Sequence, residues 1–247
     1  MPNFNLKIAG QVGAVECLFD STPYYLARYV THDTAGFSAS VSREDLERER
    51  QFRDAEALEE GMKLRKVTEP FLERLAIQRK FAEHLMVQGT MMVHGSAVTV
   101  DGVGYIFTAR CGTGKSTHTR LWREAFGGRA VMINDDKPFI RLDGTEATVC
   151  GAPWSGKHGL DTNSEVTLGG ICLLERGKEN EIRPIIEDEI PELTRNLRWF
   201  MESERVAQFD SLAAELVRRV PLWHMKCNMD PSAAEMSHGV MSGETQA

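Results

Sequence analysis

A short glycine-rich segment carries the residues in this sequence that are best suited to chemistry. Residues 109–116 (ARCGTGKS) follow the pattern G-x-x-x-x-G-K-[ST], except that Ala109 replaces the first glycine. Small residues let backbone N–H groups converge on a phosphate, and a helix beginning at Lys115 directs the positive end of its dipole at the same anion. The pattern therefore predicts nucleotide binding, whereas a chance glycine turn is the alternative.

The pattern also assigns individual roles within the segment. Lys115 is expected to neutralise the β- and γ-phosphate oxygens of ATP, and the Ser116 hydroxyl is expected to ligate Mg²⁺. An apolar strand over 103–108 and an amphipathic helix over 115–126 are predicted on either side, which is the context that the pattern requires. The predicted nucleotide-binding residues are Cys111, Gly112, Thr113, Gly114, Lys115, Ser116 and Thr117.

Two adjacent carboxylates follow the next predicted strand. The apolar run 131–133 leads through Asn134 into Asp135 and Asp136, at the C-terminal end of a strand, where α/β proteins form their sites. One carboxylate can hold Mg²⁺ and the other can accept the proton of a hydroxyl group. The sequence leaves this division open, with Asp135 taken as a metal ligand beside Ser116. A solvated acidic turn is the alternative.

A second glycine-bracketed segment, residues 153–159 (PWSGKHG), has the composition of a binding loop. Its lysine could clamp a γ-phosphate or an acidic substrate, and its tryptophan could stack on a flat or apolar group. An exposed turn with a half-buried tryptophan is the alternative. The predicted substrate-binding residues are Trp154, Lys157, His158 and Asn163.

The order of these segments resembles the C-terminal catalytic domain of HPr kinase/phosphorylase, whose fold is shared with phosphoenolpyruvate carboxykinases. The resemblance covers about residues 91–176. Four segments carry it: His94-Gly95-Ser96-Ala97, the Asp101-Gly102 hairpin, the glycine loop 111–117 and Asn134-Asp135-Asp136-Lys137.

The resemblance implies a mixed sheet, ATP and Mg²⁺ bound through Lys115 and Ser116, and His94 beside the transferring phosphate. It implies that Asp135 or Asp136 is the catalytic base, and that the protein assembles into homo-oligomers. The first ninety residues do not resemble the regulatory domain of HPr kinases, and no segment matches the one that reaches the protein substrate. The chain is closer to shorter HPr-kinase-like proteins, some of which phosphorylate a serine hydroxyl.

Hydrophobic periodicity predicts a small N-terminal module (1–66) and a larger catalytic domain (67–247). Within the module, strands are expected at 4–8, 12–19 and 24–30, followed by a solvated helix or mobile connector over 42–66. A helix capped by Thr68 is expected over 68–88. Further strands are predicted at 91–94, 96–100, 103–108, 130–134, 170–174 and 221–227, and further helices at 191–220 and 231–241.

Composition narrows the class of protein. The net charge of −7 argues against nucleic-acid binding, which needs a basic face. No run of roughly 20 apolar residues predicts a membrane span, and the start of the chain lacks the pattern of a secretory signal, so a cytoplasmic location is expected. The five cysteines are widely spaced and are expected to be reduced, with Cys111 in the glycine loop open to oxidation.

The sequence therefore predicts an ATP-dependent kinase that acts on a hydroxyl group of a small molecule or a peptide. Two other classes remain open. One is a nucleotide-binding sensor or scaffold without turnover, against which the intact Asp135-Asp136 pair argues. The other is a carboxykinase-like enzyme, for which the chain looks short and lacks evident additional metal-binding residues.

Overall fold

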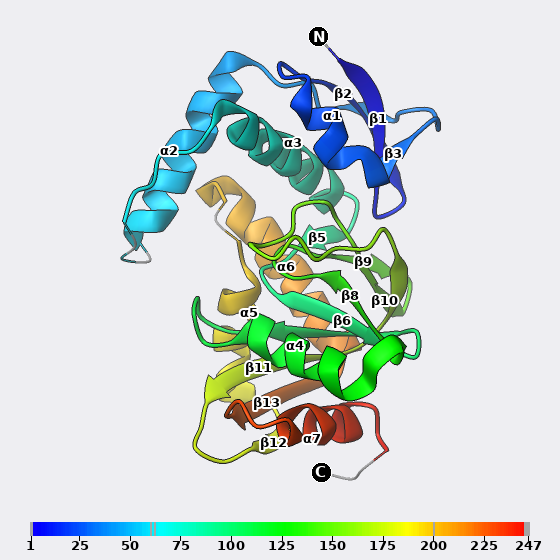
Figure 1. Ribbon diagram of the computed structural model, residues 1–247, viewed down its shortest axis with the longest axis vertical. Helices are drawn as coiled ribbons and strands as arrows, with labels where there is room; N and C mark the ends of the chain where they lie inside the picture. Colours follow the sequence, from blue (N-terminus) through cyan, green and yellow to red (C-terminus); the bar gives the residue numbers. More distant parts are fainter. Residues whose placement is uncertain (1, 60, 62, 200, 245–247) are drawn as a thin grey trace.

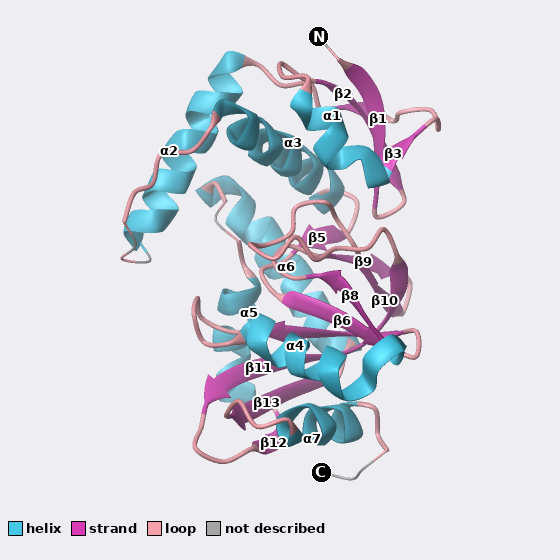
Figure 2. Cartoon of the chain, viewed as in Figure 1, coloured by secondary structure: helices cyan, strands magenta, loops and turns pink. Residues whose placement is uncertain are grey.

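The protein contains two β-sheets with helices packed around them (Figures 1 and 2). The computed structural model describes residues 2–59, 61, 63–199 and 201–244. Within this part of the chain, a four-stranded sheet lies near the N-terminus and a larger mixed sheet spans residues 90–227. The predicted α/β class, with a mixed sheet and a small N-terminal β-containing part, is therefore confirmed.

The N-terminal sheet has the strand order β3-β1-β2-β4. Strands β1 (Asn3–Ile8) and β2 (Gln11–Glu16) form an antiparallel hairpin. Ala9 and Gly10 at its turn both have positive φ, as the tightest hairpin turns require. The short strands β3 (Val30–Thr31) and β4 (Phe37–Ser38) complete the sheet.

The strand predicted over 24–30 is wrong. Residues Ser21–Leu26 form helix α1, a 3₁₀ turn η1 (Ala27–Tyr29) follows, and only Val30 begins a strand. Thr22, Leu26 and Tyr29 are buried while Tyr24 is exposed, a spacing of three and four residues that fits a helix instead of the alternation of a strand. Pro23 is tolerated here because it lies in the first turn of the helix.

Two long helices connect the sheets. Helix α2 (Arg43–Glu59) occupies most of the predicted connector, and α3 (Glu69–Met86) matches the predicted helix. Thr68 holds the N-cap position, but its side chain makes no capping hydrogen bond. Arg79 of α3 donates to both carboxylate oxygens of Glu49 of α2, and both side chains are buried, so the two helices are joined by an ion pair shielded from water.

The larger sheet combines antiparallel and parallel pairs. Its strand order is β5-β9-β10-β11-β7-β6-β8, and β13 pairs with the second half of β11 and with β12. The pairs β7–β11 and β11–β13 are parallel, so these strands end at one edge of the sheet. The strands are β5 (Thr90–Met92), β6 (Ser96–Val100), β7 (Val103–Thr108), β8 (Ala130–Asn134), β9 (Phe139–Asp143), β10 (Glu146–Cys150), β11 (Glu165–Arg176), β12 (Glu181–Pro184) and β13 (Leu222–Cys227).

Helices cover this sheet from two sides and divide the apolar interior into two clusters. The smaller cluster packs α4 (Lys115–Phe126) and α7 (Ser232–Met241) on the sheet around the fully buried Trp122. The larger one joins α3, α5 (Ile190–Leu197) and α6 (Ser203–Arg219) to the sheet and continues into the N-terminal strands. Short 3₁₀ turns η2 (Gly127–Arg129) and η3 (Glu187–Glu189) complete the described elements.

Phe81 of α3 links the two parts of the chain. Its ring is fully buried. The ring centroid lies 4.9 Å from that of Phe37 in β4 and 5.9 Å from that of Trp154 in the second glycine-bracketed loop. Phe81→Ala is expected to lower the free energy of unfolding by about 3–5 kcal/mol, because it leaves a cavity at this junction. Chemical denaturation measures the change. Val87→Ala, at an exposed residue after the same helix, should change stability by less than about 0.5 kcal/mol, and equal losses would refute this role of Phe81.

Candidate phosphate-transfer site

The glycine loop lies between the end of β7 and the start of α4. Gly112 and Gly114 have φ values of 76° and 132°, which residues other than glycine rarely adopt. Gly114 is also the N-cap of α4 and supplies no capping side chain. No side chain therefore caps the first N–H groups of the helix, which is the geometry that anion-binding helix termini have.

Arg176, at the end of β11, braces this loop. Its guanidinium donates to the carbonyl oxygens of Gly112 at 2.5 Å and Thr113 at 3.2 Å. Lys115 donates from Nζ to the carbonyl oxygen of Ala109 at 3.0 Å, so its ammonium group lies against the start of the loop. Sequence reasoning missed Arg176, although its place at the end of an apolar strand was the available signal.

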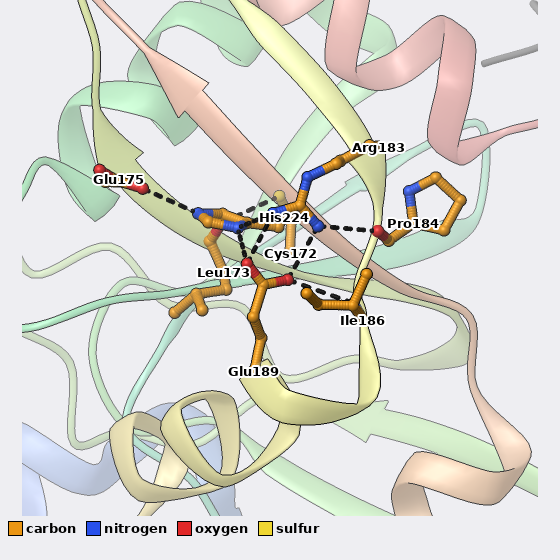
Figure 3. Close-up of polar contacts among 8 residues, drawn as sticks. All are labelled: Cys172, Leu173, Glu175, Arg183, Pro184, Ile186, Glu189 and His224. Carbon is orange, nitrogen blue, oxygen red and sulfur yellow. Dashed lines mark hydrogen bonds and ion pairs between the residues drawn. The ribbon is translucent and has the colours of Figure 1, made fainter.

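An ionic cluster lies behind this brace, where β11, β12 and β13 meet (Figure 3). The ring of His224 lies between two carboxylates, with Nδ1 2.8 Å from Glu189 and Nε2 3.2 Å from Glu175. Arg183 donates two hydrogen bonds to Glu189 and lowers the pKa of that carboxyl to about 2. The cluster ties the end of β11, which carries Arg176, to β12 and β13.

A pocket of about 500 Å³ opens between this cluster and the glycine loop. Arg110 and Thr113 line its loop side, while Glu192 and Asn196 of α5 line the other side. Its volume is in the range of small-molecule sites.

His94 is fixed beside the acidic pair. Its backbone N–H donates to the carbonyl of Leu197 at 2.7 Å, and its carbonyl accepts from the Thr108 hydroxyl at 3.0 Å. Its Nε2 lies 3.6 Å from Oδ1 of Asp136. Burial and the charges of Lys137 and Lys115 lower the pKa of His94 to about 2, so the imidazole is neutral at physiological pH and the contact with Asp136 is not an ion pair.

The side-chain amide of Asn134 shapes the turn that carries the two aspartates. Its oxygen accepts from the N–H groups of Asp136 at 2.8 Å and Lys137 at 2.7 Å. Its nitrogen donates to the carbonyl of Ala152 at 2.7 Å. One buried amide therefore joins the end of β8 to the start of the second glycine-bracketed loop.

The two aspartates have different surroundings. Asp135 is 4% exposed, and its Oδ1 accepts from the N–H of Gly156 at 2.5 Å. Its Oδ2 is buried and has no hydrogen-bond partner among the described residues. Burial raises the pKa of Asp135, and the neighbouring charge of Asp136 adds to the effect. Asp136 is half-exposed and lines a large pocket together with His94.

The second glycine-bracketed loop contains one packing residue and two exposed residues from the predicted set. Trp154 is only 5% exposed and packs on Phe81 and Phe139, and it also lines the large pocket that contains His94 and Asp136. Lys157 and His158 are exposed at the tip. Asn163 donates its amide to the backbone carbonyl of Arg28 at 2.9 Å, so it contacts protein.

Asp161, which sequence reasoning missed, ties this loop to the N-terminal part. Its carboxylate accepts from Arg28 at 2.8 Å, from the Tyr29 hydroxyl at 3.1 Å and from Ser155 at 3.1 Å. The side chain is buried. The first thirty residues therefore help to position the loop that carries Gly156, which bonds to Asp135.

The cysteines are free thiols. Cys111 is exposed on the glycine loop, Cys227 is half-buried, and Cys17, Cys150 and Cys172 are buried. Among the described residues, no helix has the length and apolar character needed to cross a membrane.

Comparisons with known proteins give distant likenesses to solved structures. No protein-family model matches the chain, and no curated protein matches it. A solved structure of the HPr(Ser) kinase/phosphatase from Coxiella burnetii aligns with 62% of this chain and 96% of its own, at 8% identity and a TM-score of 0.36. At this level of similarity, function has to be argued from the residues of the site.

Asp135→Asn is expected to stabilise the fold at neutral pH. The folded-state pKa of Asp135 is raised, so ionisation costs more in the folded chain than in the unfolded one. This penalty is absent below the unfolded pKa of about 4 and grows as the pH rises through it. Thermal unfolding should show a higher melting temperature at pH 7 and a smaller gain at pH 4. Asp136→Asn should change the melting temperature less. A lower melting temperature of Asp135→Asn at both pH values would contradict the view that the charged form of Asp135 destabilises the fold.

For the nucleotide binding that the sequence of the glycine loop predicts, Arg176→Ala is expected to lower the affinity roughly tenfold, because two charge-assisted hydrogen bonds that hold the loop are lost. Calorimetric titration with an ATP analogue measures the change. Arg123→Ala removes an exposed arginine from α4 and should leave the affinity unaltered. Equal affinity of both variants would show that the brace is dispensable.

Proposed function

We propose that this protein is an ATP-dependent kinase that transfers the γ-phosphoryl group to a hydroxyl. The supporting observation is that a glycine loop at a helix N-terminus shares one region with a carboxylate pair and a neutral histidine. Cys111 of the loop, His94 and Asp136 line the same pocket. Phosphoryl transfer needs mainly positioning and charge neutralisation, and this arrangement offers both.

The residues present fit a Mg²⁺ ion. Asp135 Oδ2 is a buried oxygen without a partner in the described part of the chain, and Ser116 supplies a hydroxyl at the start of α4. No group of three or more metal-binding side chains occurs among the described residues. Mg²⁺ suits such a sparse site, because it commonly binds one or two carboxylates and takes its other ligands from phosphates and water. When bound, it would neutralise charge on the triphosphate.

The remaining groups have separate roles in the proposed reaction. Lys115 and the N-terminus of α4 bind the phosphates and stabilise negative charge as it shifts to the leaving ADP. The acceptor oxygen forms a bond to the γ-phosphorus while the bond to the bridging oxygen of ADP breaks. Asp136, on the pocket wall, takes the hydroxyl proton. His94, neutral and 3.6 Å from Asp136, can donate a hydrogen bond from its imidazole to the transferring phosphate.

Lys115→Ala should lower phosphoryl transfer by at least about 100-fold while the fold is retained, because a charge at the phosphate oxygens is removed. The wild type is incubated with ATP, Mg²⁺ and a pool of metabolites and short peptides, and mass spectrometry detects a product heavier by one phosphate. Arg120→Ala, which removes an exposed cation from the same helix, is the matched control.

Two results would count against this function. Retained turnover in Lys115→Ala would show that the loop is not the phosphate site. Nucleotide binding by the wild type without transfer or hydrolysis would favour a sensor or scaffold.

A further inference from the structure

A pocket of about 810 Å³ lies between the long helices and the acidic end of β8. One wall carries His94, Asp136 and Cys111, and the facing walls come from α1, α2, α3 and the segment before α3. The volume lies within the range of small-molecule sites. Because the pocket contains the proposed catalytic carboxylate, its far walls are placed to select the acceptor.

The charge of this pocket is opposite to that of the whole protein. Five cationic side chains line it, namely Arg53, Lys63, Arg65, Arg74 and Lys137, against the two carboxylates Glu56 and Asp136. The chain as a whole has a net charge of −7. A local excess of cations in an acidic protein raises the concentration of anions at that point.

Arg74 is the cation best prepared for a ligand. Its guanidinium lies 4.0 Å above the ring of Tyr25 and 5.6 Å from that of Phe71, and no carboxylate among the described residues forms an ion pair with it. Stacking fixes the plane of a guanidinium and leaves its edge N–H groups available to a carboxylate, which they match in geometry. Lys137, next to Asp136, likewise has no carboxylate partner in the described part of the chain.

Resting on the proposed function, we infer that the phosphoryl acceptor is a small molecule that carries a carboxylate as well as its hydroxyl. The carboxylate binds Arg74, supported by Lys137, whereas Arg53 is already paired with Asp54. The hydroxyl faces Asp136 and His94. The rings of Tyr25 and Phe71 border the intervening apolar surface. The helices that precede the glycine loop in the sequence thus determine which hydroxyl compounds are accepted.

The test uses matched pairs of compounds that differ only in charge: N-acetylserine with N-acetylserinamide, glyceric acid with glyceramide, and phenyllactic acid with phenyllactamide. The full chain is given each compound with ATP and Mg²⁺, and phosphate gain is measured by mass spectrometry. Binding is measured separately by calorimetry, with and without a non-hydrolysable ATP analogue. The variant is Arg74→Gln, and the control is Arg48→Gln, an exposed arginine of α2 outside this pocket.

Acids should bind or react roughly 10- to 100-fold better than their amides. Arg74→Gln should remove the preference for acids, whereas Arg48→Gln should keep it. Both variants should bind the ATP analogue with the affinity of the wild type. Three results overturn the inference: amides equal to acids, Arg74→Gln equal to Arg48→Gln, or no acid bound by a protein that binds nucleotide. Failure of the wild type to bind nucleotide would instead overturn the proposed function. In that case, calorimetry of the acids and amides without nucleotide still shows whether the pocket prefers a carboxylate.

Discussion

Parallel pairing of β7 with β11 is the constraint on which the site depends. In this pairing Thr108 lies opposite Leu173, so the chain leaves β7 for the glycine loop at the same edge where β11 delivers Arg176. Parallel strands bring their carboxyl ends together, which lets a guanidinium reach two loop carbonyls and hold the entry to α4. The cluster around His224 then keeps β11, β12 and β13 in place.

The N-terminal part is structurally connected to this edge. Arg28 and Tyr29 bond to Asp161, Asn163 returns a bond to Arg28, and Phe81 packs between the N-terminal strand β4 and Trp154. These contacts position the loop whose Gly156 N–H bonds to Asp135. Helices α1, α2 and α3 build the facing walls of the large pocket, so the N-terminal part of the chain would face the acceptor in the proposed reaction.

Electrostatics gives the two adjacent aspartates different chemistry. Asp135 points into the protein, where burial disfavours its charged form and leaves one oxygen without a hydrogen-bond partner among the described residues. Asp136 lies at the pocket wall beside a neutral histidine. In the proposed reaction, the buried carboxylate is suited to hold a cation and the half-exposed one is suited to take a proton. The turn made by Asn134 supports this division, because its amide oxygen holds the N–H groups of Asp136 and Lys137, while the N–H of Asp135 donates to Leu160.

Sequence reasoning predicted the features that depend on local pattern. The order of strand 103–108, glycine loop and helix 115–126 followed from apolar periodicity and from glycines in conformations that other residues avoid. The carboxylates after the strand 130–134 were also visible, because they lie directly next to a buried run. Residues 24–30 were misassigned because short apolar runs fit a strand or a helix equally, and packing decides between them.

By itself, the sequence determined the glycine loop before α4 and the presence of an acidic pair, since both are set by neighbouring residues. The tertiary structure decided which distant groups join them: Arg176 lies 64 residues from Gly112, and Arg28 lies 133 residues from Asp161. It also decided that Trp154 packs on Phe81 and that both Trp154 and Arg74 line the pocket of Asp136. Such contacts depend on strand pairing and helix packing, which local residue patterns do not specify.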